Sequence, residues 1–223
     1  MRKVNLGSGT TCLDDWINVD SSFNARLAKH PRLRYLLFKI GFLPKKYHEM
    51  PWSEHAKSLV VRDVRKGLRF DDSSIDFIYS SHFIEYLSKD EAGKLLKECL
   101  RVLKRKGVLR LSIRDLEILA RNYIKQTDEL RTNGGKRARL PSEGLLDALL
   151  LIDTEPGKAS HLLERIFIPK CKWIFDEFSL TELLESCGFV KIQKRSYQVG
   201  KVPDIDLLDN RPKQSLYLEA EKP

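Results

Sequence analysis

The sequence predicts an α/β fold in which a mostly parallel sheet carries helices on both faces. Short apolar runs rich in β-branched residues alternate along the chain with amphipathic helical patterns, as in strands joined by crossover helices. The 223 residues, 42% of them hydrophobic, are enough for one sizeable core. We therefore expect one domain over residues 1–223, with insertions at about 22–57 and 127–170 that form a substrate lid or cap.

The first predicted strand leads directly into a glycine turn. The apolar stretch from Val4 to Leu6 runs into Gly7-Ser8-Gly9, and a second apolar stretch from Trp16 to Val19 ends in Asp20. Glycines allow a tight turn and a close approach of the backbone to a ligand, and the acid can accept hydrogen bonds from ribose hydroxyls. This sequence pattern, typical of a strand, turn and helix that bind a nucleotide, predicts a cofactor that contains a nucleoside.

The residues after the turn indicate which cofactor it is. A dinucleotide site has the longer G-x-G-x-x-G pattern, whereas positions 10 and 11 are Thr and position 12 is Cys here. S-adenosylmethionine has a ribose but no phosphate to hold, so a short G-S-G turn with a nearby acid suits it better. The alternative is an ordinary glycine turn without a ligand.

The first insertion contains a basic amphipathic stretch, from about residue 24 to residue 47. Its apolar residues recur at helical spacing with Arg and Lys between them, namely Leu33, Leu36, Leu37 and Ile40, and Gly41 and Pro44 would end the helix. The helix is either a lid packed on the core or a surface that lies on an anionic membrane or holds a lipid-linked substrate. The net charge of +9 favours anionic partners without choosing among them.

The next two predicted strands place polar residues where ligands bind in such sheets. One runs from Ser58 to Val64, with Asp63 near its end, and the other from Ile75 to Tyr79, with Ser80, Ser81 and His82 just beyond it. Ligands of α/β sheets bind outside the carboxyl ends of the strands. His82 is the candidate general base, because an imidazole titrates near working pH. The alternative is a histidine bonded to a backbone carbonyl.

The following segment repeats this order of helix and strand. Apolar residues at spacings of three and four predict a helix from Lys89 to Lys104, and Gly107 ends it. A strand from Val108 to Ile113 follows, with Arg114 and Asp115 at its tip as candidate substrate contacts, and then a helix over about 116–125.

The second insertion is less regular than the rest of the chain. It contains the basic cluster Lys136 to Arg139 and a short apolar helix near residues 145–152, which together indicate a substrate cap or else a solvated loop. A helix from Ser179 to Ser186, ended by Gly188, and two strands, Phe189 to Tyr197 and Ser215 to Ala220, complete the chain.

The composition of the chain indicates which compartment and which class of protein to expect. The four cysteines are scattered without a C-x-x-C pair, so neither a disulfide framework nor a metal site is indicated, and a reducing compartment is expected. No apolar run has the length of a bilayer-spanning helix. We expect a cytoplasmic protein, either soluble or peripheral at a membrane.

Several stretches together resemble a known family. V-N-L-G-S-G, W-I-N-V-D, D-F-I-Y-S-S-H-F-I-E-Y-L and F-S-L-T-E-L-L-E-S-C-G-F occur in the order typical of class I S-adenosylmethionine-dependent methyltransferases, and more narrowly of the type 11 group. The resemblance covers nearly all of residues 1–125 and 172–222 and neither insertion. It implies a Rossmann-like sheet of about seven strands, parallel except for one strand in the C-terminal hairpin.

The resemblance also implies roles for single residues. The turn backs the methionine part of S-adenosylmethionine, Asp20 binds the ribose, and the segment after the Ile75 to Tyr79 strand lies beside the transferable methyl group. The implied cofactor residues are Asn5, Gly7, Ser8, Gly9, Asp20, Asp63, Val64, Ser80 and Ser81. Tyr86 joins Arg114 and Asp115 as a candidate substrate contact, and no metal is implied.

The chain departs from its relatives at places where a histidine is common. Many relatives have E-H-L where this chain has Glu85-Tyr86-Leu87, and a histidine before the K-W-x-x-D run where it has Cys171. Any role of those histidines as a base is missing here.

The expected function is that of a methyltransferase of class EC 2.1.1.-, most simply one that methylates a hydroxyl of a small molecule or glycan. No N-P-P-[YF] run follows the Ile75 to Tyr79 strand, which disfavours methylation of an exocyclic amine. The alternatives are an RNA methyltransferase, in which the basic clusters would neutralise phosphates, and a non-catalytic protein that binds S-adenosylmethionine. Nucleic acid is not the favoured partner.

Overall fold

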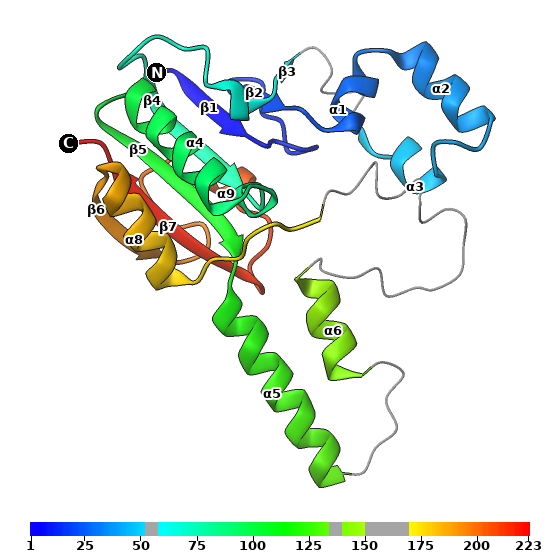
Figure 1. The fold of residues 1–223 in the computed structure, drawn as a ribbon. Coiled ribbons are helices and arrows are strands. Elements are labelled where there is room, and N and C mark those ends of the chain that lie inside the picture. Colours follow the sequence, from blue (N-terminus) through cyan, green and yellow to red (C-terminus); the bar gives the residue numbers. More distant parts are fainter. Residues whose placement is uncertain (52–57, 134–139, 150–169) are drawn as a thin grey trace.

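The computed structural model describes residues 1–51, 58–133, 140–149 and 170–223 (Figure 1). Its sheet has seven strands in the order β3-β2-β1-β4-β5-β7-β6. The strands are β1 (Lys3–Leu6), β2 (Ile17–Asp20), β3 (Leu59–Val61), β4 (Ile75–Ser81), β5 (Leu103–Arg114), β6 (Val190–Arg195) and β7 (Ser215–Glu221). Only β7 runs against its neighbours β5 and β6. The predicted Rossmann-like sheet with an antiparallel C-terminal hairpin is therefore confirmed.

Helices lie around this sheet and beyond its end. They are α1 (Phe23–Ala28), α2 (Pro31–Lys39), α3 (Lys45–His48), α4 (Lys89–Val102), α5 (Leu116–Asn133), α6 (Pro141–Ala148), α8 (Glu177–Cys187) and α9 (Ile205–Leu208), with short 3-10 turns η2 (Val64–Lys66) and η3 (Ile84–Tyr86). The helices α4 and α8 lie side by side on one face of the sheet (Figure 1).

The packing of α4 follows from its sequence. Ser88 and Glu91 form a capping box at its start, each side chain bonding the other residue's backbone N–H. Its apolar residues at spacings of three and four are buried and join the main core, namely Ala92, Leu95, Leu96, Cys99 and Val102. Leu180 and Leu184 of α8 belong to the same core.

The other face of the sheet is covered in a different way. A second cluster there joins Trp16, Tyr79 and Val108 with Val202 and Leu208, which come from the segment around α9. The helix α9 has four residues, so most of this cover consists of turns and loop.

The connection from β1 to β2 corrects one expectation. The predicted helix after the glycine turn is wrong: residues 7–16 form a loop without a helix. Polar side chains hold this loop instead. The Asn5 amide donates to Thr11 O at 2.8 Å, and the Asn18 amide donates to Leu13 O at 2.9 Å.

Several boundaries also differ from the predictions. Ser80 and Ser81 are the last two residues of β4 and do not follow it, and β5 begins at Leu103 instead of Val108. The single helix expected in the first insertion is three helices, broken after Ala28 and after Lys39. Of the second insertion, α5 continues to Asn133 and α6 ends at Ala148. The cluster 136–139 and the end of the predicted helix near 152 lie outside the described residues.

Both groups of inserted helices stand at the same end of the molecule. The parallel strands point toward α1–α3 and toward α5 and α6, so we call this end the carboxyl edge of the sheet (Figure 1). All four cysteines are buried free thiols. Among the described residues, no helix combines the length and the apolar character needed to span a membrane.

Candidate functional site

The glycine turn is fixed to the ends of two neighbouring strands. Gly7 and Gly9 have φ angles of 66° and 55°, which favour glycine over residues with a side chain. The N–H groups of Gly7 and Ser8 donate to Val19 O of β2 at 2.8 and 3.2 Å. The turn is thereby held between β1 and β2 at the carboxyl edge.

Asp20 closes this turn from the side of β2. Its Oδ2 accepts a hydrogen bond from Gly9 N at 2.9 Å, and its Oδ1 accepts one from Ser22 N at 2.7 Å. The residue is partly exposed. Each carboxylate oxygen has a further lone pair, so the group can still accept bonds from two adjacent hydroxyls.

The serines at the end of β4 lie next to the turn. The Ser80 side chain is buried and donates to Leu6 O at 3.0 Å, which ties β4 to β1 directly beneath the turn. Ser81 follows it at the strand end and is partly buried. The structure therefore brings the glycine turn, Asp20 and the two serines to adjacent strand ends.

Asp63 and Val64 lie farther along the same edge, after β3. The Asp63 carboxylate accepts bonds from Arg65 Nε at 2.9 Å and Arg65 Nη2 at 2.7 Å, and these bonds lower the pKa of Asp63. The Val64 side chain is buried in the main core. Of these two predicted cofactor residues, Asp63 thus has a partner already, and the side chain of Val64 is taken up by the core.

His82 follows β4 with an unusual backbone and a buried ring. Its φ angle is 47°, and its Nε2 lies 2.8 Å from the hydroxyl of Ser215 at the start of β7. Its Nδ1 is buried without a hydrogen-bond partner and lies 3.6 Å from Glu85 Oε1. Burial, with lesser contributions from Arg211 and Arg114, lowers the pKa of His82 to about 3, so the ring is neutral at physiological pH.

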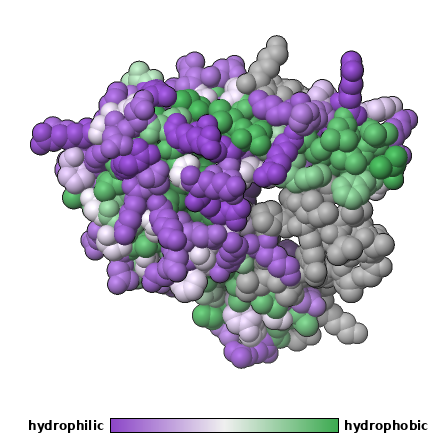
Figure 2. All heavy atoms as spheres, turned by 45° about the horizontal axis from the view of Figure 1, so that its top comes forward, coloured by the Kyte–Doolittle hydropathy of each residue, from purple (hydrophilic) through white to green (hydrophobic). Residues whose placement is uncertain are grey.

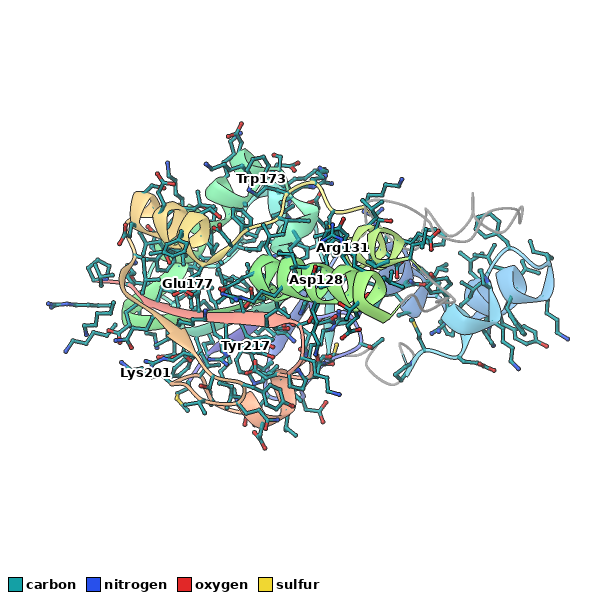
Figure 3. The ribbon with its side chains drawn as sticks, turned by 90° about the horizontal axis from the view of Figure 1, so that it is seen from below. Asp128, Arg131, Trp173, Glu177, Lys201 and Tyr217 are labelled. Carbon is teal, nitrogen blue, oxygen red and sulfur yellow. The ribbon has the colours of Figure 1, made fainter. Side chains whose placement is uncertain are left out.

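Glu85 lies in this region as well, and we predicted no role for it from the sequence. Its carboxylate is fully buried, and Oε1 accepts bonds from Arg114 N at 2.7 Å and Arg114 Nη1 at 3.1 Å. Its backbone carbonyl accepts bonds from Lys172 N and Trp173 N at 2.8 and 3.2 Å. Glu85 therefore joins the end of β5 to the segment before α8, which includes Trp173 (Figure 3). The position of this acid within the apolar run I-E-Y-L could have indicated a buried, paired carboxylate.

Of the predicted substrate contacts, Arg114 and Tyr86 lie near Glu85, whereas Asp115 caps a helix. Arg114 is buried, with its Nη1 also 3.6 Å from Cys171 Sγ, the residue that replaces the histidine of many relatives. Burial raises the pKa of Tyr86, and Arg114 opposes that shift. Asp115 begins α5, where its carboxylate accepts bonds from Glu117 N and Ile118 N.

Comparison with known proteins shows which proteins this chain is similar to. A family model described as a methyltransferase domain matches residues 42–111, a span from the end of the first insertion into β5. Over this span the chain is similar to the methyltransferases of type 11. The glycine turn and Asp20 precede the matched span, and they occupy the strand ends at which the resemblance put the cofactor.

Solved structures of methyltransferases share the fold of this chain. A protein of Thermotoga maritima, described as a possible histamine N-methyltransferase, has 18% identity and a TM-score of 0.50, covering 100% of this chain and 82% of that one. An S-adenosylmethionine-dependent methyltransferase of Archaeoglobus fulgidus has 16% identity and a TM-score of 0.52, with coverage of 99% and 86%. No curated protein matches this sequence.

The glycine turn is open on one side and closed on the other. A Cβ atom on Gly9 would meet no atom within 4 Å, whereas one on Gly7 would lie 2.3 Å from the ring of Phe83. The Phe83 ring thus closes the side at Gly7, and the side at Gly9 and Asp20 is open. The carboxylate of Asp20 and the backbone of the turn would hold the ribose and the methionine part there.

The buried ring of His82 predicts a dependence of stability on pH. As the pH falls below 6.5, the unfolded chain protonates this histidine, while the folded protein does not until about pH 3. The free energy of unfolding should therefore decrease in this window by up to about 1.4 kcal/mol per pH unit. We expect the free energy of unfolding of His82→Asn, measured by urea denaturation at several pH values, to fall less steeply as the pH decreases. The difference in slope should correspond to the uptake of about one proton. Asparagine tolerates the positive φ. An unchanged slope would contradict the assignment of a neutral ring.

Proposed function

We propose that this methyltransferase transfers a methyl group from S-adenosylmethionine to a hydroxyl of a small molecule or glycan. The observation that carries the proposal is the buried, unpartnered Nδ1 of His82 directly after the end of β4. In the tautomer in which Nε2–H donates to the Ser215 hydroxyl, Nδ1 has a free lone pair, and a substrate hydroxyl can donate a hydrogen bond to it. An acceptor held in this way would lie next to the strand ends that carry the cofactor turn.

In this reaction the protein has to accept one proton from the acceptor hydroxyl. When bound, S-adenosylmethionine supplies a methyl group that its positively charged sulfur already activates. The acceptor oxygen forms the new C–O bond while the C–S bond breaks with its electrons on sulfur, and the hydroxyl gives up its proton. His82 would receive that proton at Nδ1. Because its pKa is about 3, the transfer is favourable only late, when the oxygen has become strongly acidic.

The remaining polar groups would orient the base and the acceptor. Ser215 holds the Nε2 side of the His82 ring, and this leaves Nδ1 as the atom that faces Glu85. Arg114 neutralises Glu85 and is fixed by it. Positioning of this kind can supply several kcal/mol of a methyl-transfer barrier.

The two insertions support a lid over this site. The helices α1–α3 and α5 with α6 stand beyond the carboxyl edge (Figure 1). In our proposal they cover the bound acceptor and exclude water from it, as lids do in many enzymes.

The role of His82 can be tested with the same asparagine variant. We expect His82→Asn to lower kcat about 10²–10⁴-fold, the usual contribution of a general base, while the Kd of S-adenosylmethionine changes less than about threefold. The exposed His30 provides the control, because His30→Asn should leave both quantities unchanged. Initial rates and calorimetric titration measure the two effects. A variant with full turnover would remove His82 from the reaction.

The acceptor class has its own experiment. The protein is incubated with methyl-labelled S-adenosylmethionine and separate pools of sugars, glycans, small alcohols, amines and RNA, and the product is identified by mass spectrometry. A methyl ether in the sugar or alcohol pools supports the proposal. Label only on an amine or on RNA overturns it, and S-adenosylmethionine binding without label in any pool favours a non-catalytic protein.

A further inference from the structure

One face of α2 is apolar and exposed. Leu33, Leu36 and Ile40 are 45%, 55% and 66% exposed, and we call these three residues the apolar stripe. Residues three, four and seven positions apart lie on the same side of a helix, so the stripe is continuous across α2 and its C-cap. Figure 2 shows hydrophobic residues gathered on this side of the molecule beside hydrophilic ones.

The stripe is held outward by contacts on the opposite side of α2. Arg34 is 6% exposed, and its Nη2 donates to Tyr47 O, His48 O and Met50 O at 2.8, 2.9 and 2.9 Å. Leu27 and Leu43 form a small core with Tyr47 under the helix. Rotation of the stripe into that core would take Arg34 away from three carbonyls. The exposed apolar face is therefore a fixed feature of the fold.

The surroundings of the stripe are strongly basic. Residues 21–50 contain seven Lys and Arg residues but a single acid, Glu49, in a chain whose net charge is +9. Arg32 and Lys39 are exposed on α2 itself. Lys39 Nζ lies 5.5 Å from the ring centre of Tyr35, which is 54% exposed.

We propose that the apolar stripe docks on a membrane that contains anionic phospholipids. Leu33, Leu36 and Ile40 would enter the boundary between head groups and acyl chains. Arg32 and Lys39 have long side chains that reach the phosphate level while their stems remain with the apolar residues. A short amphipathic helix on a rigid base suits a reversible contact of this kind.

Other partners match these observations less well. RNA would use the positive charge but gains nothing from exposed leucine and isoleucine, since bases bind by stacking on aromatic or guanidinium planes. A second copy of the chain would bring two such basic surfaces together, and their charges would repel each other.

The location of the stripe connects it with the cofactor end of the sheet. The helix α1 begins three residues after Asp20, and α2 follows it at the carboxyl edge (Figure 1). If the proposed function also holds, a docked enzyme would receive an acceptor hydroxyl that is anchored in the membrane. This last step rests on the proposed function, whereas the docking itself does not.

Vesicle sedimentation with the full chain tests the docking. Vesicles of phosphatidylcholine mixed with phosphatidylserine are compared with pure phosphatidylcholine at low salt. We expect binding to the anionic vesicles only, weakened by added salt. The double variant Leu36→Ser/Ile40→Ser should lower the partition coefficient about tenfold or more. The control is Ile124→Ser on α5, a residue 56% exposed outside the basic segment, which should bind like the natural chain.

Several outcomes would overturn the proposal. These are no sedimentation at low salt, equal sedimentation of the double variant, or equal binding to both kinds of vesicle. Light scattering on the same samples provides a further test, because a dimer that only the double variant loses would assign the stripe to a second copy of the chain. The assay needs neither cofactor nor acceptor, so its failure is distinguishable from failure of the methyl-transfer proposal.

Discussion

Replacing Arg110 with leucine is expected to lower the free energy of unfolding by about 3–5 kcal/mol. Arg110 is fully buried in β5, and its guanidinium pairs with Asp209 at 2.5 Å and with Glu219 at 3.2 Å. Leucine would leave the buried Asp209 without a cation and would leave Glu219 with Arg195 alone, which lies 3.1 Å away. Breaking a buried pair by removing one partner is costly because the remaining charge is desolvated and uncompensated.

The loss should be large because Arg110 also fixes the second face of the sheet. Its guanidinium donates to Val199 O at 3.1 Å and Ser196 O at 3.2 Å, which holds the segment before α9. The ring of Tyr217 lies 5.0 Å from the same guanidinium, on the face of β7 away from α4 and α8 (Figure 3). Tyr79 adds a bond from its hydroxyl to Leu208 O at 2.9 Å.

Thermal and urea denaturation measure the effect. The melting temperature should fall by roughly 6–20 °C, since about 1 kcal/mol corresponds to 2–4 °C in a domain of this size. The control is Arg121→Leu, which breaks an exposed pair with Glu117 and should cost less than about 0.5 kcal/mol. An Arg110→Leu protein as stable as the control would show that the cluster does not hold the second face.

This cluster illustrates what the sequence could not predict. Arg110 stands inside the apolar run V-L-R-L-S-I, where the strand itself was predictable from local pattern. Its partner Asp209 is 99 positions away, and no local spacing connects the two. The same holds for His82 with Ser215, which are 133 positions apart. Contacts between distant segments depend on the strand order, and that order is a property of the whole chain.

The glycine turn and Asp20 of the candidate site were predictable because they lie close together in the sequence. Gly9 and Asp20 are 11 positions apart and joined by a direct hydrogen bond, so turn and acid form one short motif. The helix expected between them is missing because the side chains of Asn5 and Asn18 satisfy the loop backbone in its place. Glycine and acid positions thus predicted the turn, whereas the connection behind it depended on polar side chains that carry no such signature.

Asp20→Ala is expected to weaken S-adenosylmethionine binding by about 100-fold or more. The carboxylate would accept hydrogen bonds from the ribose hydroxyls, and a bond to a charged group contributes about 1.5–3 kcal/mol. Alanine also removes the bonds to Gly9 N and Ser22 N, so the turn itself loses its support. Because Asp20 is partly exposed, the fold should remain intact by circular dichroism. Calorimetric titration with S-adenosylmethionine and S-adenosylhomocysteine measures the affinity.

Two further variants separate a ribose contact from a supported turn. Asp20→Asn keeps one oxygen that can accept the bond from Gly9 N, but it has no charge. If its affinity for S-adenosylmethionine lies between those of the natural protein and Asp20→Ala, the negative charge itself contributes to binding the ribose. Asp15→Ala removes an exposed acid from the same loop and should bind like the natural protein. Equal loss in Asp15→Ala and Asp20→Ala would point to the net charge of the loop. Full affinity in Asp20→Ala would mean that the glycine turn is structural and that the cofactor is held elsewhere.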